Sequence, residues 1–186
     1  MNSKNFWGTA LIGMLVLGLS IGAAAQDPKT EVFSWEINTY SPQLTSSSGS
    51  TTGPYEVRGP WSLTLTTATN TANFSAALNM ELSDGWAMTL NGGNFDPAAR
   101  AAHTHHITLT NAHVTPITGG FKVTGTARVT LNGAKAPISP SPVEIDITGG
   151  SIIPYSNITM TFALPASGHF GTEALAGVVR SVQKDF

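Results

Sequence analysis

Four of the five histidines in this chain lie within residues 103–113, at His103, His105, His106 and His113. Imidazole nitrogen binds Zn, Cu, Fe and Ni, and histidine also acts as a general acid or base near neutral pH. These residues are the main concentration of reactive side chains in the sequence. We therefore expect any metal-dependent chemistry of the protein to centre on them.

Strand geometry would divide this cluster. If the segment forms a β-strand, His103 and His105 share one face and His106 lies on the other. Two imidazoles at i and i+2 can reach the same ion. His113 would lie roughly 26 Å from His105 along a continuous strand, at about 3.3 Å per residue. It can join the pair only if the chain reverses or bulges near Asn111.

A metal site built on the pair needs a third ligand, since a catalytic zinc site has three protein ligands and one open position. The candidates are His113 and His169, and Asp96 is a possible oxygen ligand. The metal hypothesis is therefore a divalent transition metal, Zn or Cu, bound by His103 and His105 with His113 or His169. The competing interpretation is that the pair lies at the solvated start of a strand and binds nothing.

Other candidate chemistry is sparse. Outside the apolar N-terminal run over residues 8–22, no serine stands in a Gly-x-Ser-x-Gly motif, and nothing singles out a catalytic triad. Glu144 and Asp146 would lie about 7 Å apart on one strand face, a spacing that suits paired-carboxylate chemistry, but a solvated strand face explains them better. Tyr40, Tyr55 and Tyr155 fall at strand ends or in loops and are candidates for stacking on a ligand. The incomplete catalytic set favours a protein that is not an enzyme.

The elements that position these residues are predicted to be strands. Apolar and polar side chains alternate with a period of two, which is typical of antiparallel strands with one buried face. Trp35, Trp61 and Trp86 fall on apolar faces and are expected in the core. The fold class is therefore all-β, a single antiparallel β-sandwich or closed β-barrel of roughly eight to ten strands. The alternating segments are residues 31–40, 59–67, 73–82, 86–90, 103–110, 121–131, 143–148 and 158–164.

Three segments lack this clear alternation. Residues 41–54 are almost entirely Ser, Thr, Gly and Pro, which predicts a flexible loop. Residues 134–142 contain three prolines, which cannot donate to a strand ladder, so a loop is expected there as well. Residues 175–182 are predicted to form a closing strand because they contain Gly and paired valines. A short helix beginning at Thr172 is the alternative.

Residues 1–25 have the pattern of a secretory signal peptide. Lys4 precedes an apolar run over residues 8–22, and small residues end at Ala25. A run of about 15 residues is shorter than the roughly 20 needed to span a bilayer. We therefore predict cleavage near Ala25 and export to the periplasm or extracellular space, leaving a single all-β domain over 26–186. The alternative is an uncleaved N-terminal anchor.

Composition limits the possible partners. The chain has no cysteine, so its stability depends on packing and not on disulfides, and it cannot carry an N-terminal lipid on cysteine. Charged residues make up 11% of the chain and the formal net charge is −2. Nucleic acid is excluded as an expected partner, because nothing in the sequence could neutralise a run of phosphates. A glycan, an envelope component or a small ligand remains possible, with no transmembrane span expected after processing.

These observations support three functions. The first is an exported all-β binding or structural module of the cell envelope or extracellular space, suggested by the low charge and the missing catalytic set. The second is a metal-binding β-barrel protein or metal-dependent enzyme that uses the His-x-His pair. The third is a carrier barrel that holds a small ligand. The sequence favours the first, with the second as the main alternative.

Overall fold

The computed structural model describes residues 29–41, 55–82, 103–132, 135–150 and 155–184. The predicted signal peptide, Trp86, Asp96 and all but the first residue of the predicted loop 41–54 lie outside the described residues.

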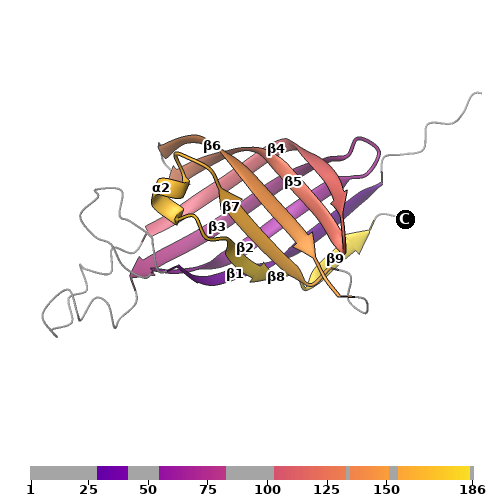
Figure 1. Cartoon of the computed structure of the whole chain (residues 1–186), viewed down its shortest axis with the longest axis horizontal. Coiled ribbons are helices and arrows are strands. Elements are labelled where there is room, and N and C mark those ends of the chain that lie inside the picture. Colours follow the sequence, from indigo (N-terminus) through magenta and orange to yellow (C-terminus); the bar gives the residue numbers. More distant parts are fainter. Residues whose placement is uncertain (1–28, 42–54, 83–102, 133–134, 151–154, 185–186) are drawn as a thin grey trace, which may run out of the picture.

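The described residues form a closed antiparallel barrel (Figure 1). Each strand from β1 to β8 pairs with the next in sequence, and β8 returns to pair with β1. Strand β9 pairs with β1 beyond β8, along the same edge. The prediction of an all-β fold is thus confirmed, and of the two architectures the barrel is the one observed. The elements are β1 (Thr30–Ser41), β2 (Tyr55–Thr66), β3 (Thr71–Leu82), β4 (His103–Ile117), β5 (Gly120–Leu131), β6 (Lys135–Thr148), β7 (Asn157–Phe162), α2 (Ser167–Phe170), β8 (Leu175–Val178) and β9 (Ser181–Lys184).

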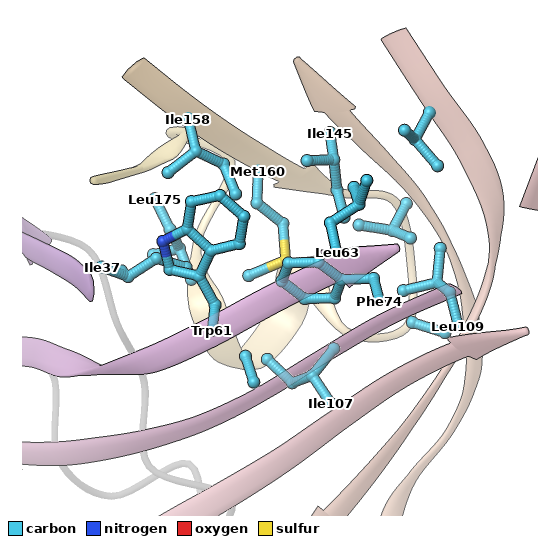
Figure 2. Close-up of a cluster of buried hydrophobic side chains, with 14 of the residues drawn as sticks. Ile37, Trp61, Leu63, Phe74, Ile107, Leu109, Ile145, Ile158, Met160 and Leu175 are labelled. Atoms are coloured by element: carbon cyan, nitrogen blue, oxygen red, sulfur yellow. The ribbon is translucent and has the colours of Figure 1, made fainter. Parts of the chain in front are cut away.

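The barrel interior is packed with apolar side chains from all around the wall. Figure 2 shows Leu63 and Phe74 from β2 and β3 meeting Ile145 and Met160 from β6 and β7. Trp61, which is 3% exposed, lies with its ring centroid 6.1 Å from that of Phe74. An eight-stranded barrel is just wide enough for such side chains to fill it. The apolar residues of the period-two alternation therefore line the inner face of the barrel.

Trp35 departs from this pattern. The alternation predicts a core position beside Ile37, but Trp35 is 42% exposed. Strand β1 pairs with β8 at Ile37 and with β9 at Ser34, so Trp35 lies beside the interruption between those two strands. The guanidinium carbon of Arg180, from that interruption, lies 5.3 Å from the Trp35 ring centroid. The core prediction was wrong for Trp35 because the wall beside it is incomplete.

Strand β4 contains a bulge that reverses the faces of its second half. The pairing of β4 with β5 shifts between Thr108 and His113, and Asn111 has a positive φ of 52°. Before the bulge the odd-numbered residues from His105 onward are buried, and after it Ala112 and Val114 are buried instead. An extra residue in one strand produces such a reversal. His113 is consequently exposed on the outer face.

The predicted loop over residues 134–142 was wrong, because these residues belong mostly to β6. The pairing of β6 with β5 shifts twice between Ala127 and Leu131, and each shift leaves one proline of β6, Pro137 or Pro140, out of the regular ladder. Proline has no N–H to donate, and a bulge is a place where a strand does not need one. The prolines therefore interrupt the pairing without ending the strand.

The C-terminal segment forms strands, as the paired valines predicted, but in two pieces, β8 and β9. Between them the N–H of Val179 bonds the carbonyl of Ser156, and that of Arg180 bonds Ser34. Before β8, residues 167–170 form the helical turn α2 at one end of the barrel (Figure 1). Among the described residues, no helix is long and apolar enough to cross a membrane.

Candidate metal centre

Three histidine side chains meet at the end of the barrel that α2 covers. Nε2 of His105 lies 2.8 Å from Nε2 of His169, and Nε2 of His103 lies 3.4 Å from the same atom. One ring nitrogen from each residue lies within 4.8 Å of the other two. His169 is 64 positions from His105 and 66 from His103 in the sequence, and the fold brings all three into one potential coordination sphere.

Strand β4 supplies two of the three rings. His103 and His105 lie at its start, before the bulge, so both point to the inside of the barrel. Across β3, Met80 pairs with His103 and Leu78 pairs with His105. His105 is 1% exposed, whereas His103 is only partly buried. His105 therefore lies in the apolar interior, and His103 lies closer to the rim of the barrel.

The third ring comes from α2, which two contacts fix against the barrel. The Ala166 N–H donates to Ser141 Oγ at 3.0 Å, and Ser141 Oγ donates to the carbonyl of Ser139 at 2.9 Å. The ring of Phe170 stacks on Phe162 of β7 with 4.8 Å between centroids. Because a single helical turn has little stability of its own, these contacts hold His169 in place.

A backbone carbonyl sets the tautomer of His105. Its Nδ1 lies 3.2 Å from the carbonyl oxygen of Thr130 in β5. A carbonyl only accepts hydrogen bonds, so Nδ1 of His105 carries the proton and Nε2 presents a lone pair. The short contact with His169 is then a bond in which Nε2–H of His169 donates to Nε2 of His105. A carbonyl bound to the far nitrogen is the usual partner of a metal-binding histidine.

Burial also keeps His105 neutral. The pKa of His105 is lowered to about 3, mostly by desolvation and in part by the charges of His169 and His103, against the opposing effect of the Thr130 hydrogen bond. Only neutral imidazole binds a metal ion. His105 is therefore in its ligand form throughout the neutral range.

Two of the three spacings among these nitrogens are close to those around a small ion, and the His103–His105 pair lies within 4.8 Å. With metal–nitrogen bonds of 2.0–2.1 Å, tetrahedral ligands lie about 3.3 Å apart. The 3.4 Å separation agrees with this value, and the 2.8 Å pair would widen slightly as an ion replaces the shared proton. His103, His105 and His169 can together hold a metal ion, and three neutral imidazoles suit Zn or Cu better than Mg or Ca.

The remaining sequence candidates lie apart from this cluster. His106 and His113 are exposed on the outer face, so His169 and not His113 joins the pair. Tyr55 is buried, and Tyr155 packs edge-on against Phe33 with 5.2 Å between ring centroids. Tyr40 belongs to β1, and its side chain lies outside the described part.

Glu144 and Asp146 lie on the outer face of β6, where Lys122 of β5 forms ion pairs with both. The hydrogen bond from Lys122 to Glu144 raises the pKa of the lysine. Partial burial raises the pKa of Asp146, and the lysine charge opposes this. These contacts describe a cross-strand ion cluster on a solvated face, as the alternation predicted.

Two residues that support the centre could not be identified from the sequence. Thr130 acts through its backbone carbonyl, which has no residue-type signal, and Ser141 is one hydroxyl among many. Comparison of the chain with protein-family models, with curated proteins and with solved structures finds no match. The functional argument therefore rests on the geometry of the three histidines.

Proposed function

We propose that this protein is a metal-binding β-barrel protein whose ligands are His103, His105 and His169. The observation that carries the proposal is the convergence of their three ring nitrogens, all within 4.8 Å of one another. Three neutral imidazoles without a carboxylate favour a divalent transition metal, Zn or Cu.

The surroundings of the three rings support the same function. Apolar contacts hold the rings, with the ring centroid of Phe170 5.0 Å from that of His105 and 5.1 Å from that of His169. An apolar shell limits solvent access and strengthens metal–ligand interactions. A solvated strand start, the competing interpretation, would not bury His105 completely. Of the three functions that the sequence supports, metal binding therefore has the most specific support.

Metal titration tests this proposal. Protein stripped with a chelator is titrated with Zn(II) or Cu(II) against a competing chromophoric chelator. We expect one equivalent to bind to the parent protein and none to bind tightly to the double variant His103→Ala/His105→Ala. Binding should also raise the thermal unfolding midpoint of the parent, because the folded state alone holds the three ligands together.

A matched control removes two other histidines. The double variant His106→Ala/His113→Ala loses the same number of imidazoles, but from the exposed outer face. It should bind metal like the parent protein. Equal metal affinity in the parent and in His103→Ala/His105→Ala would refute the proposal, and so would loss of binding in the control alone.

We also propose that the protein acts outside the cytoplasm. The support is the pattern of residues 1–25, with Lys4, the apolar run and the small residues that end at Ala25. Mass spectrometry of the protein recovered from the cell exterior or periplasm should give a chain that begins at Gln26. Recovery of the intact chain from the cytoplasm alone would contradict export and would leave the metal site untouched.

A further inference from the structure

Met80 is the direct cross-strand neighbour of His103. In the antiparallel ladder between β3 and β4, the Cα atoms of these two residues are partners, and the next inward pair is Leu78 with His105. Residues directly opposite in such a ladder have Cβ atoms about 4.5–5.5 Å apart. The thioether of Met80 therefore starts within side-chain reach of the three imidazoles.

The side chain of Met80 also points into the barrel. It is fully buried, and it shares the inner face of β3 with Leu78 and Ala76. His103 and His105 point to the same interior from the adjacent strand. A methionine side chain is unbranched, with three rotatable bonds, so its sulfur can adjust to a nearby ion.

The other ladder partners of the two histidines carry no donor atom. Leu78 faces His105 from β3, and Leu131 faces it from β5. Of the residues paired with His103 or His105 on their inner face, Met80 is the one that has a lone pair to offer. A three-histidine site leaves one position of a tetrahedron open, and Met80 is the cross-strand neighbour of one of the three ligands.

We propose that Met80 is the fourth ligand of this centre and makes it selective for copper in the cuprous state. The inference rests on the proposed three-histidine site. Thioether sulfur is a soft ligand that selects Cu(I), whereas Zn(II) is bound by nitrogen, thiolate and oxygen. Zn(II) would use the three imidazoles and a water molecule, so sulfur contributes to the affinity for one metal and not the other.

The test compares two metals in one variant. Anaerobic titration with Cu(I) against a Cu(I)-specific chelator, and titration with Zn(II), are done on the parent and on Met80→Leu, which nearly conserves core volume. We expect Met80→Leu to weaken Cu(I) binding about tenfold or more, the effect of losing a metal-site contact, and to leave Zn(II) binding unchanged. X-ray absorption of the Cu(I)-loaded parent should show a bound sulfur that the variant lacks.

Met160→Leu is the control, because Met160 is equally buried but lies on β7 among Leu175 and Ile145. It should bind both metals like the parent. The inference is overturned if Met80→Leu binds Cu(I) as tightly as the parent, if it loses both metals equally, or if the parent spectrum shows no sulfur. Failure of the parent to bind any metal would instead remove the three-histidine site itself.

Discussion

At the scale of single residues, Tyr55 carries a buried hydroxyl that has no hydrogen-bond partner among the described residues. Burial also raises the pKa of Tyr55. A buried polar group without a partner costs about 1–3 kcal/mol, so its removal should be stabilising. We expect Tyr55→Phe to raise the free energy of unfolding by about 1 kcal/mol in urea titration. Tyr155→Phe, at a partly buried phenol, should have little effect, and destabilisation by Tyr55→Phe would show that its hydroxyl is bound.

His105 makes the stability of the metal-free protein depend on pH. Its pKa is lowered to about 3 in the folded protein, whereas an unfolded histidine titrates near ~6.5. Between these values the unfolded chain binds the extra proton, so stability is greatest above about pH 6.5 and falls as the pH falls. The contribution of His105 to the slope of the free energy of unfolding against pH approaches about 1.4 kcal/mol per pH unit. His103 and His169 face it within the cluster.

Urea unfolding with a chelator at pH 7 and pH 5 measures this slope. His105→Gln keeps an amide donor for the Thr130 carbonyl but cannot titrate, so its slope should be shallower than that of the parent. His106→Gln, on the exposed face of the same strand, should keep the parent slope. An unchanged slope in His105→Gln would mean that His105 is protonated in the folded state.

The residue types and parity of β4 were enough to predict that His103 and His105 lie together as candidate ligands, because they stand two positions apart on one strand face. His169 could be named only as one of two candidates, since nothing local links it to β4. The carbonyl of Thr130 could not be predicted at all. Its role depends on the register between β4 and β5, which no side chain encodes by its type.

At the scale of elements, the Ser141 hydroxyl makes one of the two contacts that hold α2 against the barrel. Ser141→Ala leaves the buried N–H of Ala166 without its acceptor, at a cost of about 1–2 kcal/mol. We expect a lower free energy of unfolding, faster amide exchange in α2 and weaker metal binding, because α2 carries His169. Ser139→Ala should change none of these, since Ser139 is exposed and contributes its backbone carbonyl. Normal exchange in Ser141→Ala would show that the Phe170 contact alone holds the turn.

The strands were predictable where alternation is strict, and β5 is the clearest example. The bulges were not predictable, because they depend on which neighbour a strand meets. In β4 a single extra residue near Asn111 reverses parity and turns His113 outward. In β6 two bulges accommodate prolines that, in isolation, indicate a loop. Assigning residues to the inner or outer face by their odd or even positions therefore works up to the first bulge of a strand and fails beyond it.

At the scale of the whole molecule, closure of the barrel depends on how β1 meets β8. A closed barrel leaves no unpaired edges between its strands, and here closure also brings α2 back over the start of β4. The sheet closes through the pair Ile37 and Gly177. The absence of a side chain at Gly177 lets the two strands approach, because an added Cβ would overlap the Glu36 carbonyl and lie 2.8 Å from the Cα of Ile37.

Gly177→Ala should therefore weaken the closing seam. We expect the free energy of unfolding in urea to fall by about 1–3 kcal/mol, the usual cost of overpacking, with faster amide exchange in β8 than in β5. Gly150→Ala is the matched control, since its added Cβ would meet nothing within 4 Å and should leave stability unchanged. Metal affinity should fall in Gly177→Ala as well, because the segment that carries His169 runs between β7 and β8. If Gly177→Ala is as stable as the parent, the close approach of β8 to β1 at Ile37 contributes little to stability.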